Sequence, residues 1–249
     1  MKKAIIIAAG MGKRLRPLTD DMPKCLLRVG RKSILANQIN IYKSLGLKNI
    51  NIICGYKKNK FEKTIANFFF NKNYKKNNIL ESLFCAKKIL NGDCLISYSD
   101  IIFKKSNIKQ ILQSKDNISI LTDISWKNNY KNRNLHPVSE AEKVSIDSTG
   151  KLIATGKNLN IKRTDAEFVG ILKLDPIGCK IFKKYYETAK KKFKRKNFYN
   201  SKSITKAYIT DFLNFLVYNK ITVKCIKIKG GWMEIDTVED FNKAQKFYN

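Results

Sequence analysis

The apolar and polar positions along the chain alternate in the manner of an α/β protein. Short apolar runs predict strands over residues 4–9, 51–54, 94–98, 118–123, 168–174 and 222–228, and two more, 143–147 and 152–155, predict a hairpin. Longer segments predict helices over residues 33–45, 60–70, 80–90, 176–194 and 203–219. Ser33 and Gly46 are placed to cap the first helix, and Thr237 with Asp240 forms a box-like start for a final one.

Strands that alternate with helices predict a sheet covered by helices on both faces. We therefore expect a Rossmann-like α/β fold with a mixed, mainly parallel sheet. The 249 residues are enough for one such core. Neither an internal repeat nor a low-complexity linker divides the sequence. The predicted organisation is a single domain over residues 1–249, with an inserted region at about 126–173.

The formal net charge of +30 raises the question of nucleic-acid binding. The lysines are spread along the whole sequence, however, and the only dense basic run is 190–196. A solvated helix end explains this run at least as well as a binding arm does. Nucleic-acid binding is therefore not the favoured interpretation, although a positive field would attract small phosphorylated molecules.

The sequence favours a cytoplasmic protein without a membrane anchor. No apolar run approaches the roughly 18 residues that a bilayer-spanning helix needs. The apolar run 4–9 is also too short for the core of a signal peptide. The six cysteines have no C-x-x-C spacing, and the single histidine cannot complete a zinc cluster with them, so we expect reduced thiols.

The segment after the first predicted strand combines glycines with cations. It reads Ala8-Ala9-Gly10-Met11-Gly12-Lys13-Arg14-Leu15-Arg16-Pro17-Leu18-Thr19 and is followed by Pro23-Lys24. Glycines let backbone N–H groups approach phosphate oxygens, and Arg14 and Lys24 can neutralise phosphate charge. The segment is not a P-loop, and Leu15 stands where a dinucleotide fingerprint needs its third glycine. Taken alone, the G-x-G pair is also compatible with an ordinary turn.

Three carboxylates are candidates for a metal site. Asp100 ends the run that begins at Leu95, and ligands bind at the carboxyl ends of the strands in α/β sheets. Glu234 and Asp236 are two residues apart, so in an extended segment they point to the same face and can bind one hard cation. Alternatively, these two acids only precede the final helix, where their negative charges interact favourably with the positive N-terminal end of the helix dipole.

The glycine segment resembles the signature A-A-G-x-G-x-R-L-x-P-L-T-x(n)-P-K of the sugar-phosphate and phosphocholine nucleotidyltransferase superfamily. The likeness recurs over most of the chain, up to residues 232–244. It implies a fold of the nucleotide-diphospho-sugar transferase type and an enzyme that moves a nucleoside monophosphate from an NTP to an acceptor. It also implies a nucleotide-binding surface formed by Ala8, Ala9, Gly10, Met11, Gly12, Lys24 and Ser82.

The resemblance assigns further roles residue by residue. Arg14 and Lys24 match the catalytic residues that stabilise the charge transferred to pyrophosphate. Asp100 and Asp236 match the ligands of the Mg²⁺ cofactor, and in the CTP-using branch Glu234 often joins them. One departure is a serine before Asp100, where the family usually has glycine; the change is mild because serine is also small.

The implied chemistry needs no general base. A phosphate monoester has its second pKa near about 6, so it is already a largely dianionic nucleophile at neutral pH. The protein has to hold two anions together and stabilise the departing pyrophosphate, which positioning and electrostatics can achieve. His136, the only histidine, is therefore expected to have a positioning or structural role.

Two segments are similar to the branch that uses CTP and small acceptors such as phosphocholine, aminoethylphosphonate or phosphoglutamine. They are residues 78–86 and the string Tyr130-x-x-Arg133-x-x-His136-Pro137-x-x-Glu140-Ala141-Glu142-Lys143-Val144. The expected partners are CTP and a small phosphorylated acceptor, which region 126–173 would bind. The candidate acceptor contacts are Tyr130, Arg133, Lys157 and Glu167; ordinary exposed positions are the alternative for each. A phosphocholine-type acceptor would favour an aromatic cage, for which the candidates are Trp126, Tyr130 and Trp232.

Other functions stay open at this point. An enzyme that makes an NDP-sugar would prefer UTP or dTTP, and a nucleic-acid-binding protein would show a steep salt dependence. A non-catalytic relative would only sense a nucleotide, but the retained Arg14, Lys24, Asp100 and Asp236 argue against it. The branch also implies a place in capsule or cell-surface polysaccharide synthesis. The oligomeric state is left open, with a homodimer as one option.

Overall fold

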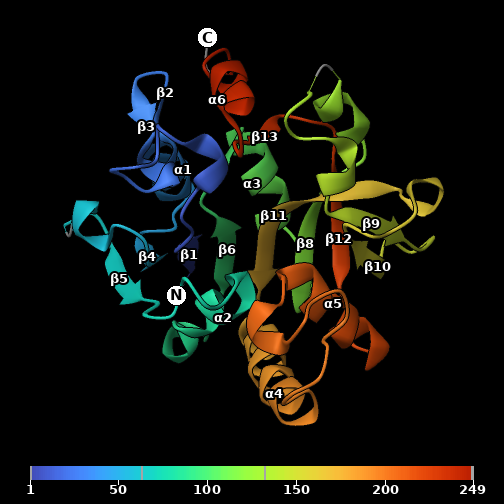
Figure 1. Ribbon diagram of the computed structural model, residues 1–249. Helices are drawn as coiled ribbons and strands as arrows, with labels where there is room; N and C mark the ends of the chain where they lie inside the picture. The colour runs from blue at the N-terminus through green and yellow to red at the C-terminus, as the bar shows by residue number, and fades with distance from the viewer. Residues whose placement is uncertain (1, 63, 132, 248–249) are drawn as a thin grey trace.

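A large mixed sheet forms the centre of the protein (Figure 1). The structure, a computed structural model, describes residues 2–62, 64–131 and 133–247. Within these residues nine strands join in one sheet of order β10-β9-β11-β6-β1-β4-β5, with β12 attached to β11 through β8. The strands are β1 (Lys3–Ala8), β4 (Asn49–Cys54), β5 (Asn67–Phe70), β6 (Cys94–Tyr98), β8 (Ile118–Asp123), β9 (Lys143–Ile146), β10 (Leu152–Gly156), β11 (Ala166–Leu174) and β12 (Lys224–Ile228).

The strand directions confirm the expected mixed sheet. β1 runs parallel to both of its neighbours, β4 and β6, and the pairs β4–β5 and β8–β12 are also parallel. β11 is antiparallel to each of its neighbours, β6, β8 and β9. The predicted hairpin is present as the antiparallel pair β9–β10.

Helices cover both faces of the sheet because successive side chains of a strand point to opposite sides. Ile6 of β1 belongs to the core shared with α1 (Ile34–Ser44) and α3 (Lys105–Leu112). Its neighbour Ile5 belongs to the core shared with α2 (Ile79–Phe84), α4 (Pro176–Lys192) and α5 (Ile209–Tyr218). The alternation of buried residues along one strand therefore produces the two layers of helices that the sequence predicts.

A small second sheet brings distant acidic residues to the carboxyl ends of the central strands. After β6 the chain turns at Asp100 into β7 (Ile101–Phe103), which pairs antiparallel with β13 (Trp232–Glu234). The N–H of Ile235 donates a 2.8 Å hydrogen bond to the carbonyl of Asp100. The chain then enters α6 (Val238–Ala244), which starts with the predicted capping box of Thr237 and Asp240.

Most of the predicted elements are present in the structure, but the helix predicted over residues 60–70 is wrong. The end of this segment is strand β5, which adds to the edge of the sheet beside β4. Its three consecutive phenylalanines favour a strand, and pairing with β4 outweighs the helical pattern. Residue 63 of the predicted helix lies outside the described residues. The predicted helices 80–90 and 203–219 are shorter than expected, since α2 ends at Phe84 and α5 begins at Ile209. The elements α3, β7 and β13 were not predicted from the sequence.

Among the residues that the structure describes, no helix is long and apolar enough to cross a bilayer. The six cysteines all have free thiol groups in the structure.

Candidate active site

The glycine segment lies at the carboxyl end of β1 and forms one wall of a cavity of about 210 Å³. Gly12 has φ +59°, a conformation that favours glycine, and its carbonyl accepts a 2.8 Å hydrogen bond from the Thr19 hydroxyl. A Cβ at Gly12 would lie 3.1 Å from the Cβ of Lys24, so the glycine lets the lysine approach the loop. The predicted nucleotide residues on this wall are Ala8, Ala9, Gly10, Gly12, Lys24 and Ser82; Met11 is not on it.

Lys24 lies between the carboxylates of Asp100 and Asp236. Its Nζ is 2.7 Å from Oδ2 of Asp100 and 2.5 Å from Oδ1 of Asp236. Burial alone would lower the pKa of Lys24, but these two negative charges outweigh it and raise the pKa. The predicted catalytic lysine is therefore a fixed positive charge at the point where the two predicted metal-binding aspartates meet.

Arg14 approaches the same aspartate from the solvent side. Its Nη2 pairs with Oδ2 of Asp236, and its Nη1 lies 3.9 Å from Oε2 of Glu140. Burial opposes the ionisation of Asp236, but Lys24 and Arg14 outweigh it and lower the pKa of this carboxyl. Asp236 is therefore an anion held between two cations.

A second cavity of about 200 Å³ adjoins the first and shares with it Asn78, Ile79 and Asp100. Region 126–173 supplies much of its wall, and the rest comes from the glycine loop, the starts of α2 and α5, and β6, β7, β13 and the segments next to them. Gly170 of β11 has φ +78°, and a Cβ there would lie 2.6 Å from the ring of Tyr98. The absence of a side chain at Gly170 thus lets the Tyr98 ring stand on the wall of this cavity.

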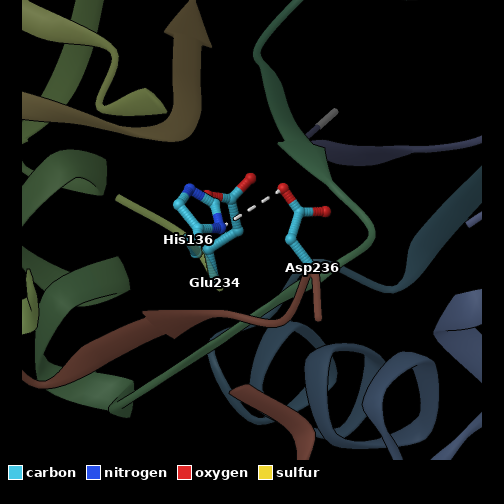
Figure 2. Close-up of side chains that lie close together, drawn as sticks. All are labelled: His136, Glu234 and Asp236. Carbon is cyan, nitrogen blue, oxygen red and sulfur yellow. Dashed lines mark ion pairs between the residues drawn. The ribbon is translucent and has the colours of Figure 1, made fainter. Parts of the chain in front are cut away.

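His136 lies beside Glu234 and Asp236, and Figure 2 shows the three side chains gathered around one point. One ligand atom from each lies within 4.8 Å of the others. Nη2 of Arg133 is 3.0 Å from Nδ1 of His136, and a guanidinium can only donate. Nδ1 is therefore the acceptor of this bond, whereas Nε2 is buried without a hydrogen-bond partner among the described residues, 3.6 Å from Oε2 of Glu234. His136 therefore lies beside both carboxylates, and its positioning or structural role stays a prediction.

The predicted metal ligands fit a divalent cation. Oδ1 of Asp100 is buried and has no hydrogen-bond partner among the described residues. Burial, together with the charges of Asp236 and Asp100, raises the pKa of Glu234 well above its usual range. A cation bound by these oxygen ligands would satisfy the free oxygen and relieve the crowding of like charges.

The predicted acceptor residues divide into two groups. Lys157 and Glu167 line the second cavity, whereas Tyr130 and Arg133 are not on its wall in the described structure. The hydroxyl of Tyr130 donates a hydrogen bond to Glu167, so Tyr130 contacts a residue of the cavity wall without lining the cavity itself. Of the candidate cage residues, Trp126 is buried at 1% exposure, and only Trp232 is among the described residues that line the cavity.

Arg133 is bonded to the segment that carries Glu234 and Asp236. Its Nε donates a 2.6 Å hydrogen bond to Oδ1 of Asp240, and its Nη2 donates to the carbonyl of Glu234. Oδ2 of Asp240 in turn accepts hydrogen bonds from the backbone N–H groups of Asp236 and Thr237. Arg133 therefore orients the segment that carries the two predicted metal ligands, and the geometry favours this role over direct contact with an acceptor.

We expect replacement of Arg133 by methionine to destabilise the fold by about 3–5 kcal/mol, because it leaves Asp240 as an unpaired buried charge. Arg133 and Asp240 have side chains that are only 3% and 0% exposed. Urea unfolding measures the loss. The matched control is Lys87→Met, which breaks the exposed pair with Glu187 and is expected to cost less than about 1 kcal/mol. Equal losses for the two variants would contradict the supporting role of Arg133.

The residues on the cavity wall that were not assigned a role from the sequence include Tyr98, Glu140 and Glu142. The signal available for the two acids was their spacing of two residues before strand β9, the same spacing as Glu234 and Asp236. For Tyr98 the only signal was its position at the end of a strand that precedes a candidate ligand.

Known proteins resemble the chain over its full length. The family model described as nucleotidyl transferase matches residues 3–126. CTP:phosphoglutamine cytidylyltransferase of Campylobacter jejuni is 32% identical, over 95% of this chain and 96% of that protein. Choline-phosphate cytidylyltransferase of Streptococcus pneumoniae is 40% identical, over 41% of this chain and 46% of that protein. A solved structure of the inositol-1-phosphate CTP transferase from T. maritima shares the fold, with a TM-score of 0.75 and 20% identity over 100% of this chain and 97% of that one.

The fold and the relatives together define an enzyme of the transferase class. The chain belongs to the nucleotidyl transferase family and is a nucleotidyltransferase. The family and the fold type that the glycine segment implied are thereby confirmed.

Proposed function

We propose that the enzyme transfers CMP from CTP to a small phosphorylated acceptor and releases pyrophosphate. The observation that carries this proposal is the adjacency of the two cavities, which meet at Asp100. The glycine-loop cavity would bind the nucleotide, and the cavity lined by region 126–173 would bind the acceptor. The choice of CTP rests on the 32% identity to the C. jejuni cytidylyltransferase over nearly the whole chain.

The proposed reaction is an in-line displacement at the α-phosphorus of CTP. An oxygen of the acceptor phosphate forms a new bond to this phosphorus while the bond to the bridging oxygen of the β-phosphate breaks, and the electron pair leaves with pyrophosphate. Lys24 lines the nucleotide cavity, and Arg14 lines the acceptor cavity next to it. Lys24 is thus placed to offset the negative charge that accumulates as pyrophosphate departs, and Arg14 is linked to the same site by its ion pair with Asp236.

We further propose that Asp100, Asp236 and Glu234 hold Mg²⁺ when the nucleotide binds. The free buried oxygen of Asp100 and the crowded carboxyl of Glu234 support this assignment. Bound there, the ion would supply positive charge to the phosphate oxygens. His136 and Arg133 would keep the carboxylates in place. Lys157, which pairs with Glu140 at 2.6 Å on the cavity wall, is the proposed contact for the acceptor phosphate.

Pyrophosphate release tests the proposal. CTP, UTP, ATP, GTP and dTTP are each combined with phosphocholine, 2-aminoethylphosphonate, phosphoglutamine, inositol 1-phosphate and glucose 1-phosphate, with and without Mg²⁺. We expect release with CTP and at least one small acceptor, and only when Mg²⁺ is present. Release confined to UTP or dTTP with glucose 1-phosphate would instead identify an enzyme that makes an NDP-sugar.

A further inference from the structure

The basic run over residues 190–196 spans the end of α4, and none of its described residues lines either active-site cavity. It contains six lysine and arginine side chains, all of them exposed. In the described parts of the chain, none of the six forms an ion pair with a carboxylate. The fold itself therefore does not neutralise this concentration of positive charge.

The surrounding sequence is also more basic than the chain as a whole. Residues 188–233 contain twelve lysines and arginines but a single acid, Asp211. Asp211 is only 2% exposed, and it accepts hydrogen bonds from the Ser201 hydroxyl and the N–H of Tyr208. Glu187, which precedes the stretch, already pairs with Lys87. The basic run therefore has no exposed acid within its own stretch to offset its charge.

Exposed aromatic side chains adjoin the basic run. A surface hollow of about 290 Å³ is lined by Lys192, Phe193, Tyr199, Phe215 and Tyr218. Tyr218 is 69% exposed and Tyr199 is 41% exposed. A second hollow of about 420 Å³ shares both tyrosines and extends to Ile153 of β10, which is 52% exposed. We call the residues of these two hollows, together with run 190–196, the basic-aromatic surface.

The basic-aromatic surface is separate from the active site. Its two hollows share no described lining residue with the two active-site cavities. Figure 1 shows α4 and α5 at the lower end of the molecule, whereas α6 and β13 lie at the upper end. A partner that covers this surface therefore need not block either cavity.

A second copy of the chain is a poor partner for this surface. In a two-fold symmetric dimer the same patch meets itself, so the two basic runs would face each other. Six exposed cations on each side would then repel those on the other. The charge instead favours an anionic partner.

The packing of the aromatic rings argues against single-stranded nucleic acid, whose bases stack on open aromatic faces. Here the rings pack on one another, because Phe193 meets Phe198 edge to face at 5.0 Å and Phe215 edge to face at 5.8 Å. The ammonium of Lys192 lies over the rings of Phe193 and Tyr218, at 5.8 Å and 5.9 Å from their centroids. The rings therefore form an apolar surface beside lysines rather than a set of stacking platforms.

We infer that the basic-aromatic surface binds anionic lipid membranes reversibly, as a peripheral contact. Lysines and arginines attract the negative headgroups, and tyrosines favour the boundary between headgroups and acyl chains. Binding of a protein to a membrane surface grows with the apolar area buried among the headgroups and with the attraction to anionic lipid, and this surface offers both. The inference does not depend on the proposed function, because it concerns residues outside the active site.

Co-sedimentation with lipid vesicles tests the inference on the full chain, without nucleotide. Vesicles of phosphatidylcholine alone are compared with vesicles that also contain phosphatidylglycerol. We expect binding to the anionic vesicles only, and a loss of this binding when the salt concentration rises from about 0.1 M to about 0.5 M, because salt screens exposed charges. Absence of binding to the anionic vesicles at about 0.1 M salt would overturn the inference.

Two double variants separate the contribution of this surface from the net charge of +30, because each removes two positive charges. Lys194→Gln with Lys196→Gln removes them from the surface, and Lys105→Gln with Lys109→Gln removes them from exposed positions of α3. We expect the first pair to weaken vesicle binding by about 10- to 30-fold, since each cation near an anionic membrane contributes roughly fivefold. The control pair should weaken it by less than about threefold. Equal losses would show that binding follows net charge alone and would overturn the inference.

Tyrosine variants test the apolar contribution without a change of charge. Tyr218→Ser is expected to weaken vesicle binding by about 3- to 10-fold, because the ring no longer enters the headgroup region. Tyr199 has φ +52°, so it is replaced by asparagine, which adopts this conformation more readily, and the same loss is expected. The matched control is Leu135→Ser, at a side chain that is 63% exposed and outside the basic-aromatic surface. Unchanged binding by both tyrosine variants would leave only charge as the cause and would overturn the inference.

Nucleic acid is tested as the alternative partner with the same lysine variants. Fluorescence anisotropy measures their binding to a single-stranded oligonucleotide, and both pairs should weaken it to the same extent. A selective loss of oligonucleotide binding in the variant at Lys194 and Lys196, with vesicle binding intact, would assign the surface to nucleic acid and overturn the inference. Thermal melting checks that each variant keeps its fold. Pyrophosphate release without vesicles should be unchanged, because none of the substituted residues lines an active-site cavity.

Discussion

Replacing Asp236 with asparagine is expected to lower kcat by about 10²- to 10³-fold or more while the fold stays intact. Asparagine preserves the shape of the side chain but removes the charge that the proposed metal site requires. The neighbouring cations Lys24 and Arg14 would also lose a shared counterion. A metal ligand should in addition show a higher Mg²⁺ concentration for half-maximal rate, so the rate is measured across a Mg²⁺ titration.

The control for this variant is Asp116→Asn, at an exposed aspartate that hydrogen-bonds with Ser114 outside both cavities. It should leave the rate and the Mg²⁺ titration unchanged. Thermal melting of both variants checks that the fold is retained. Near-normal turnover of Asp236→Asn with an unchanged Mg²⁺ requirement would show that the ligand assignment is wrong.

Replacing Lys24 with alanine is expected to reduce kcat by about 10²- to 10³-fold and to change the affinity for CTP much less. The reason is that the lysine charge matters most when negative charge moves onto the departing pyrophosphate, which happens in the transition state. Single-turnover rates give the chemical step, and equilibrium binding of CTP gives the affinity. Lys105→Ala, at an exposed lysine of α3, is the matched control.

A loss of CTP affinity with no loss of maximal rate would contradict this role for Lys24. The structure adds one expectation that the sequence did not provide. Lys24 separates the carboxylates of Asp100 and Asp236, so its removal leaves two like charges together. The Lys24→Ala protein should therefore have a lower melting temperature, and Mg²⁺ should restore part of the loss.

Local signals made the phosphate-binding half of the site predictable from the sequence. The glycine segment, Lys24 and the acids Asp100 and Asp236 follow or precede short apolar runs, and each could be named without knowledge of the fold. What brings them together is the pairing of β7 with β13, and these strands are three residues long. Runs of that length carry no periodicity, so the sequence could not predict the pairing.

The acceptor half was harder to predict because burial decides its chemistry. Arg133 and Glu167 belong to polar segments where exposure is the default expectation, yet the structure buries both. Once buried, Arg133 pairs with Asp240 rather than with solvent or substrate. The prediction of a helix over residues 60–70 was wrong for a related reason. The end of this segment forms a strand because β4 offers a free edge, and that edge exists only in the folded sheet and cannot be read from the segment itself.

The order of elements along the chain has a consequence for the enzyme during its synthesis. Every strand of the large sheet precedes β13 in the chain. Glu234 is the last residue of β13, and Asp236 follows it. Once the chain has been made up to the end of β12, all nine described strands of the sheet are present. Until residue 236 emerges, however, Lys24 and Arg14 lack their common partner. The residues that complete the proposed site are thus made after every strand of the large sheet, together with Ile235 and Ala244, which close the small core over Leu15.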